Sequence, residues 1–244
     1  MALECKLTEF FKGSNPQNTL IVFPYGGGSH LDFREWQSPL LDRFRCLAVQ
    51  YPGHGMAYGE PLATDLDSLL TCLYDTIRTA VTGNTLFFGH SLGAITAFEI
   101  TRRLNADGIK PRHLFLSGLS APHLPRRNAP VHQLSNAAFD RELLAYGGLP
   151  SFVTDDPAMM DFIRPIQRAD FGIWEKYNYQ AGSPLSCPIT ALAGEQDSHY
   201  PPEDVQPWCE HTSAAYAFQS LPGGHIYVHD NKDAIMAKIA AAGV

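Results

Sequence analysis

The 244-residue sequence is poor in cysteine, in positive charge and in long apolar runs. Its five cysteines are odd in number and contain no Cys-x-x-Cys pair, so they indicate neither a disulfide framework nor a zinc site. These cysteines are Cys5, Cys46, Cys72, Cys187 and Cys209. We therefore expect reduced thiols, no metal and a cytoplasmic protein.

Basic residues are fewer than acidic ones: the chain has 18 Lys and Arg and 25 Asp and Glu, which gives a formal net charge of −7. A nucleic-acid partner would need a basic surface, so this balance argues against one. Residues 1–11 mix charges into every turn, unlike a signal peptide, and no apolar stretch approaches the length of a membrane span. We expect a monomer with neither a nucleic-acid nor a membrane partner.

The composition that is present, 45% hydrophobic and 18% charged, is typical of a globular chain. A chain of this length can bury a full α/β core together with an inserted subdomain. We expect a single domain over residues 1–244.

The most informative stretch is a short apolar run, residues 85–88, followed by the Gly-x-Ser-x-Gly turn of residues 89–93 and a helical pattern over 92–105. A strand, this turn and a helix in succession form a nucleophile elbow. Glycine at both flanks removes side chains that would collide with the neighbouring strand or helix. The turn would expose the Ser91 hydroxyl at the head of a helix, where backbone amides favour a developing anion. The alternative is an ordinary loop that contains a serine.

A second glycine-rich turn, residues 24–29, follows an apolar β-branched run over 19–23. It lacks the Lys-Ser/Thr of a P-loop and the Gly-x-Gly-x-x-Gly spacing of a dinucleotide site. We predict an oxyanion-hole loop, in which the amide of Tyr25 or Gly26 acts beside the amide of Leu92. The alternative is a plain turn between a strand and a helix.

Further strands are predicted over 46–51 and 113–117, with a helix between them that Asp65 caps. Alternating strands and helices indicate a doubly wound parallel sheet whose ligand site lies at the carboxyl ends of the strands. His54 follows one of these ends among glycines, and we expect it to be solvated or to cap a turn.

The alternation breaks over residues 122–184, where two helices are predicted, residues 136–146 and 157–177. The segment is too long for a simple connection and too apolar for a disordered linker. We interpret it as a helical lid over the site. The alternative is an extra helical layer without a function.

The sheet pattern resumes at residues 189–193 and again at 217–221. Asp197 follows the first of these strands, and His225 follows the second within a glycine loop. The order Ser91, Asp197, His225 is that of the α/β-hydrolase triad. Glu195, Glu203 and Asp204 compete for the role of the acid, and His229 competes for that of the base.

Five segments together resemble the type II thioesterases, the free-standing editing hydrolases of polyketide and nonribosomal-peptide assembly lines. They are residues 23–29, 51–55, 89–93, 194–197 and 223–225. The resemblance covers nearly the whole chain. It implies an α/β-hydrolase fold, with a mostly parallel doubly wound sheet and a flexible helical lid.

The resemblance also implies a substrate: an acyl or aminoacyl thioester on the phosphopantetheine arm of an acyl- or peptidyl-carrier protein. Hydrolysis would clear stalled or mis-primed carriers without an organic cofactor. The sequence departs from the family at two places, with Gly53-His54 where Pro-Gly-Arg is usual and Tyr25-Gly26 where a His-Ala pair is frequent. A carboxylesterase or lipase acting on oxygen esters and a non-catalytic scaffold remain the alternatives.

Carrier proteins are typically acidic, as is this chain, so docking would require a local positive surface. Arg126 and Arg127 stand at the start of the predicted lid and are candidates for that surface. The alternative is that both side chains are merely solvated.

Overall fold

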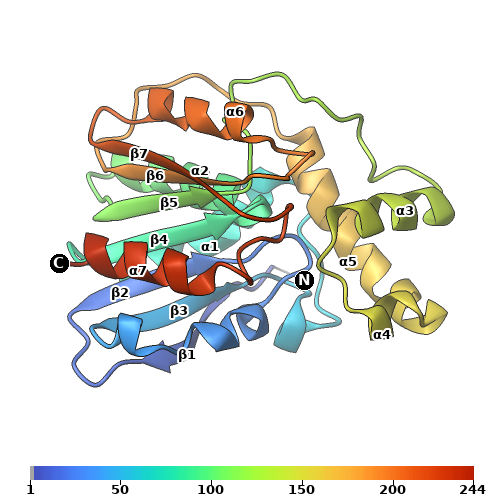
Figure 1. The fold of residues 1–244 in the computed structure, drawn as a ribbon, viewed down its shortest axis with the longest axis horizontal. Coiled ribbons are helices and arrows are strands. Elements are labelled where there is room, and N and C mark those ends of the chain that lie inside the picture. Colours follow the sequence, from blue (N-terminus) through green and yellow to red (C-terminus); the bar gives the residue numbers. More distant parts are fainter. Residues whose placement is uncertain (1–2) are drawn as a thin grey trace.

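A seven-stranded sheet in the order β1-β3-β2-β4-β5-β6-β7 runs through the molecule, whose computed structural model describes residues 3–244 (Figure 1). Every neighbouring pair is parallel except β1 with β3. The strands are β1 (Lys6–Lys12), β2 (Asn18–Phe23), β3 (Phe44–Gln50), β4 (Thr85–His90), β5 (His113–Ser117), β6 (Ile189–Gly194) and β7 (Tyr216–Leu221). The predicted fold class, a mostly parallel doubly wound sheet, is confirmed.

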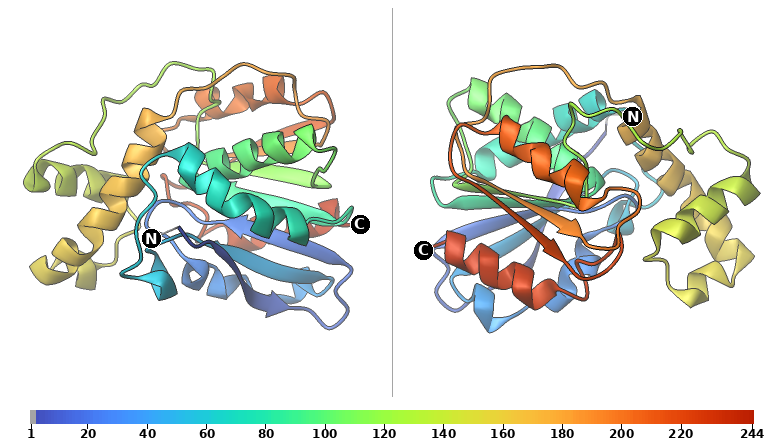
Figure 2. Two further views of the ribbon diagram at one scale, coloured as in Figure 1. Left: turned by 180° about the vertical axis from the view of Figure 1, so that it is seen from behind. Right: turned by 45° about the horizontal axis from the view of Figure 1, so that its top comes forward.

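Helices cover both faces of this sheet (Figure 2). The α-helices are α1 (Leu66–Ala80), α2 (Leu92–Ala106), α3 (Asn136–Tyr146), α4 (Ser151–Thr154), α5 (Pro157–Lys176), α6 (Pro202–Val205) and α7 (Lys232–Ala242). The 3-10 helices are η1 (His30–Trp36), η2 (Pro39–Leu41), η3 (Gly55–Ala57) and η4 (Gln206–His211). One core joins the sheet to α1 and α2, and the other joins it to η1 and α7.

Local sequence explains the elements that hold this frame. Every residue of β4 is buried, as expected for a central parallel strand. Helix α1 begins where the Asp65 side chain accepts a hydrogen bond from the amide of Ser68, 2.8 Å away. Its buried positions follow the helical period and face the core.

The first strand, β1, was not predicted. It pairs antiparallel with β3 at the edge of the sheet, and its charged side chains Lys6 and Lys12 are exposed. Charged residues are common on edge strands because they discourage further pairing, but they also obscure the strand pattern in the sequence.

The expectation that all cysteines are reduced was wrong. The structure joins Cys5 to Cys72 by a disulfide, with their Cα atoms 5.7 Å apart. The two residues are 67 positions apart, and they meet because α1 packs beside β1. An odd number of cysteines leaves room for one such pair, and Cys46, Cys187 and Cys209 are free.

Residues 122–184, here called the inserted segment, contain α3, α4 and α5 between β5 and β6. The three helices project beyond one end of the sheet in every view (Figures 1 and 2). They enclose a small apolar core of their own, which includes Phe139, Leu143 and Met160. The two predicted helices are present as α3 and α5, whereas the single turn of α4 was not predicted. Among residues 3–244, no helix is long and apolar enough to cross a membrane.

Candidate active site

Ser91 occupies the tight turn between β4 and α2. Its φ of 54° is the only positive φ at a non-glycine residue in the described part of the chain. A Cβ atom on Gly89 would overlap the backbone of Gly93, and one on Gly93 would overlap the carbonyl of Phe23. The two glycines are therefore required for the close approach of β4, α2 and β2, as the sequence predicted.

The turn brings Ser91 into a line of hydrogen bonds with two distant side chains. The Ser91 Oγ lies 3.0 Å from His225 Nε2, and His225 Nδ1 lies 2.8 Å from Asp197 Oδ2. The side chains of His225 and Asp197 are almost fully buried. Residues from the ends of β4, β6 and β7 thus meet at the carboxyl edge of the sheet.

The remaining oxygen of Asp197 is also occupied. Asp197 Oδ1 accepts hydrogen bonds from the amides of His199 and Tyr200, at 3.0 and 3.1 Å. These amides hold the carboxylate in one orientation, so that it fixes the tautomer of His225 with the proton on Nδ1.

The competing residues have other partners. Asp204 and Glu203 pair with Arg127, and His229 Nε2 lies 3.0 Å from the hydroxyl of Tyr25. Among the candidates considered from the sequence, Asp197 and His225 are the acid and the histidine that lie in line with Ser91.

His90 packs beside His225, a role that was not predicted from the sequence. His90 is fully buried, with its ring centroid 5.2 Å from that of His225. Burial, followed by the nearby His225 and His229, lowers its pKa well below the usual value, so His90 is neutral at pH 7. Its Nδ1 lies 2.9 Å from Ser117 Oγ, which in turn contacts the hydroxyl of Tyr227. The only sequence signal was its position inside the Gly-x-Ser-x-Gly turn.

Two backbone amides near Ser91, in the described part of the chain, donate no hydrogen bond. Among residues 3–244, neither the amide of Leu92 nor that of Gly26 has a hydrogen-bond acceptor. Tyr25, Gly26 and Leu92 all line the same cavity as Ser91 and His225. This arrangement is compatible with the predicted oxyanion hole, whose residues stay a prediction. The next amide along the loop, that of Gly27, is bound by Asp170 Oδ2 at 2.6 Å.

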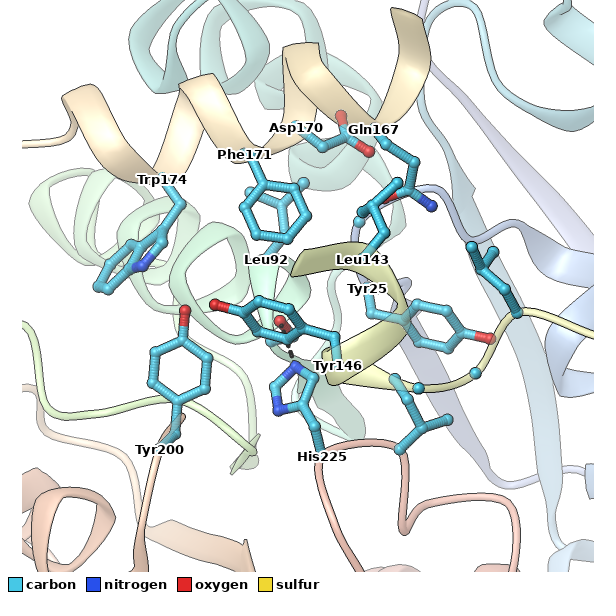
Figure 3. Close-up of a pocket in the computed structure, with 16 residues that line it drawn as sticks. Tyr25, Leu92, Leu143, Tyr146, Gln167, Asp170, Phe171, Trp174, Tyr200 and His225 are labelled. Carbon is cyan, nitrogen blue, oxygen red and sulfur yellow. Dashed lines mark hydrogen bonds between the residues drawn. The ribbon is translucent and has the colours of Figure 1, made fainter. Parts of the chain in front are cut away.

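The cavity lies between the sheet edge and the inserted segment, and its lining is mostly apolar (Figure 3). Leu143, Phe171 and Trp174 extend into it from α3 and α5. Tyr146 and Tyr200 place their rings 5.2 Å from the ring of His225. Burial raises the pKa of Tyr146 to about 12, so its phenol stays neutral near pH 7.

A second cavity lies behind this aromatic group. Tyr146, Phe171, Trp174 and Tyr200 line both cavities, so their side chains form a partition between them. The Trp174 and Tyr200 rings meet edge to face, with centroids 6.4 Å apart. The size of the space open to Ser91 is therefore set partly by α5.

The expectation that His54 is solvated was wrong, although His54 does stand at the N-cap of η3, without a side-chain capping hydrogen bond. His54 is 3% exposed, with its Nε2 2.8 Å from Asp170 Oδ2 and its Nδ1 2.9 Å from the carbonyl of Pro52. Burial lowers the pKa of His54, but the Asp170 carboxylate outweighs that effect and the pKa is raised overall. Its partner, Asp170 on α5, is 116 residues away in the sequence, so no local sequence pattern could predict the contact.

The two arginines proposed for docking are already engaged. Arg126 donates to the backbone carbonyls of Trp174, Glu175 and Tyr177 at the end of α5, and Arg127 pairs with Asp204. Carbonyls at a helix end carry partial negative charge, so Arg126 acts as a cap for α5. Neither arginine is merely solvated: Arg127 is paired with a carboxylate and Arg126 with backbone carbonyls, and the docking role stays a prediction.

No metal site accompanies these features: residues 3–244 contain no group of three or more His, Cys, Asp or Glu side chains that could hold an ion.

Comparison with known proteins gives consistent matches over most of the chain. The family model of the thioesterase domain matches residues 18–242. The linear gramicidin dehydrogenase LgrE of Brevibacillus parabrevis is 37% identical over 224 residues, which cover 90% of this chain and 85% of that protein. The thioesterase PikA5 of Streptomyces venezuelae is 33% identical over 226 residues, with 92% and 80% covered. The solved structure of the type II thioesterase BorB from the borrelidin biosynthetic cluster has a TM-score of 0.89 at 33% identity, with 98% of both chains covered.

Proposed function

We propose, from the premise that this chain belongs to the thioesterase family, that it hydrolyses acyl or aminoacyl thioesters carried on the phosphopantetheine arm of carrier proteins. Its role would be editing in polyketide or nonribosomal-peptide biosynthesis, as suggested by relatives that include the type II thioesterase BorB. The observation that carries the proposal is the line from Ser91 through His225 to Asp197, opening on an apolar cavity.

In the proposed mechanism, Ser91 is the nucleophile. Its Oγ attacks the thioester carbonyl while His225 Nε2 takes the hydroxyl proton, and Asp197 stabilises the imidazolium that forms. The carbonyl electrons move onto oxygen, and the amides of Leu92 and of Gly26 or Tyr25 would bind the oxyanion. A donor of this kind contributes about 3 kcal/mol to the stability of the transition state.

The acyl-enzyme then forms as the C–S bond breaks, and the departing thiolate takes the proton from the His225 imidazolium, which becomes neutral again. A thiolate is a good leaving group, so proton donation by His225 matters less here than in amide hydrolysis. Water attacks the acyl-enzyme with His225 again as the base, and the acid and free Ser91 are released. The neutral state of His90 is useful in both steps, because a second positive charge beside His225 would oppose formation of the imidazolium.

The test is mass spectrometry of a panel of acyl-loaded carrier proteins before and after incubation with the enzyme. We expect loss of the acyl group from the arm, with no loss when Ser91 is replaced by Ala. A matched acyl-pantetheine and oxygen ester separate this function from that of an ordinary esterase. Faster hydrolysis of the oxygen ester would overturn the proposal, as would failure of a fluorophosphonate to label Ser91.

A further inference from the structure

The glycine loop of residues 24–28 is held from two sides by different parts of the molecule. On one side, the Tyr25 hydroxyl donates to Asp32 Oδ1 and contacts His229 Nε2, each at 3.0 Å, and these residues belong to the sheet body. On the other side, the amide of Gly27 donates to Asp170 Oδ2, which belongs to α5 of the inserted segment. The loop that carries the unpartnered amide of Gly26 is therefore fixed partly by a helix outside the sheet.

Helix α5 packs closely against the glycine loop. Gly27 has a φ of 75°, and a Cβ atom there would overlap the side-chain amide of Gln167, one turn before Asp170. Asp170 is 4% exposed, and its Oδ2 accepts from both the Gly27 amide and His54 Nε2. A buried carboxylate needs such partners, because an unpaired one would be costly.

The contacts of His54 define its charge. Both of its ring nitrogens face oxygen atoms that accept hydrogen bonds, the carbonyl of Pro52 and the carboxylate of Asp170. A neutral imidazole has only one N–H, so it would leave one nitrogen lone pair against an acceptor. The contacts therefore favour the doubly protonated ring, which donates a charge-assisted hydrogen bond to the same carboxylate oxygen that binds the Gly27 amide.

We propose that Asp170, paired with His54, is a positioning residue that sets the glycine loop in its oxyanion-binding geometry. The inference rests on the proposed function and extends it. Asp170 does not touch the reacting atoms in this scheme. The Asp170 carboxylate fixes the position of the Gly27 amide. The preceding residue, Gly26, is thereby held with its own amide toward the cavity that contains Ser91. Loss of this contact acts on the transition state, where the oxyanion exists, and spares ground-state binding.

The chain offers a matched control on the same helix. Glu175 is also a buried carboxylate of α5, and it accepts from the amides of Val131 and His132 and from His132 Nδ1. It has the same kind of partners as Asp170, but all of them lie inside the inserted segment. Glu175→Ala therefore loosens α5 without releasing the glycine loop.

The experiment compares Asp170→Asn and Asp170→Ala with Glu175→Gln and Glu175→Ala on a small acyl-pantetheine. We expect kcat to fall about 10-fold in Asp170→Asn, which keeps an oxygen acceptor, and about 10²-fold in Asp170→Ala. KM should stay within about threefold in both. The Glu175 variants should lose comparable thermal stability but keep kcat within about threefold of wild type.

A second measurement isolates the oxyanion. A trifluoromethyl ketone with a short acyl chain adds Ser91 Oγ to its carbonyl carbon, passes the proton to His225 and leaves an oxyanion in the hole. Its inhibition constant should rise in parallel with the loss of kcat in the Asp170 variants, while that of a thioether analogue, which forms no oxyanion, should not change.

The outcomes are distinct. Equal kcat and ketone affinity in the Asp170 and Glu175 variants would overturn this inference alone. If Asp170→Ala does not fold, the comparison of Asp170→Asn with Glu175→Gln decides in the same way. Absence of Ser91-dependent hydrolysis in the wild-type protein would overturn the proposed function and this inference with it.

Discussion

The two halves of the candidate site are held in place by different means. At the sheet edge, backbone hydrogen bonds tie the loops to one another: the amide of Ser91 donates to the carbonyl of Ser117, and that of Gln196 donates to Gly223. The inserted segment is tied to the sheet body through side chains, including the Asp170 contacts and the hydrogen bond from the Tyr177 hydroxyl to Glu99. Backbone pairing fixes geometry for almost any side chain, whereas side-chain ties depend on single residues. We therefore expect chemistry to depend on the sheet edge, and selectivity and loop position to depend on the segment.

The largest effect should follow from Ser91→Ala. Removal of the hydroxyl that lies in line with His225 should lower the hydrolysis rate by about 10⁵-fold, since the attacking oxygen of the proposed mechanism is lost. Acyl-pantetheine turnover and thermal unfolding would be measured together. A rate near that of wild type in a folded variant would remove Ser91 from the mechanism.

Asp197→Asn should have the next largest effect, a loss of about 10³-fold to 10⁴-fold in kcat. An asparagine amide would favour the wrong tautomer of His225. Asp204→Asn is the control, because that residue competed for the same role but pairs with Arg127. Retention of full activity in Asp197→Asn, with a loss in Asp204→Asn, would reverse the assignment.

Trp174→Ala tests whether the inserted segment sets the selectivity for acyl-chain length. Opening the partition would join the two cavities, so we expect preference to shift toward longer acyl chains by about 10-fold in kcat/KM. Phe162→Ala, on the same helix but exposed to solvent, should leave the profile unchanged. Hydrolysis of a series of acyl-pantetheines is the measurement, and an unchanged optimum in Trp174→Ala would contradict a role for the partition.

Arg126→Ala should lower activity on carrier-bound and pantetheine-bound substrates by the same factor, a few-fold at most. Its guanidinium caps α5 and lies over the Trp174 ring, 5.0 Å from its centroid. Loss of the cap therefore disturbs the segment whatever the substrate. A loss confined to the carrier-bound substrate, and reduced by added salt, would restore the docking role considered from the sequence.

The smallest effect concerns pH. The pKa of His54 is raised in the folded state, so its contribution to stability is fully present below the unfolded pKa of about 6.5 and is lost as pH rises through the folded value. The difference in free energy of unfolding between wild type and His54→Gln should therefore shrink with rising pH in that window. Denaturant unfolding at several pH values measures it, and a difference that grows with pH would show that the pair is neutral.

The same division explains what could be predicted from the sequence. The elbow, the strand ends and the order of Ser91, Asp197 and His225 follow from local patterns, because glycine spacing and buried strands have local causes. The contact of His54 with Asp170 joins residues 116 positions apart, and nothing near either residue specifies the other. Strand β1 and the Cys5–Cys72 disulfide were missed for a similar reason, since each depends on packing at the sheet edge rather than on spacing.

The hydrogen bond from Gly27 to Asp170 also has a thermodynamic consequence. If the docked position of α5 favours the oxyanion-binding form of the glycine loop by some factor, linkage requires that a bound oxyanion favour the docked position of α5 by the same factor. The reacting acyl group would then stabilise α5 in its position against the glycine loop, most strongly while the tetrahedral intermediate exists. Once the acid is formed the oxyanion is gone, so α5 would be bound less tightly to the loop when the product leaves.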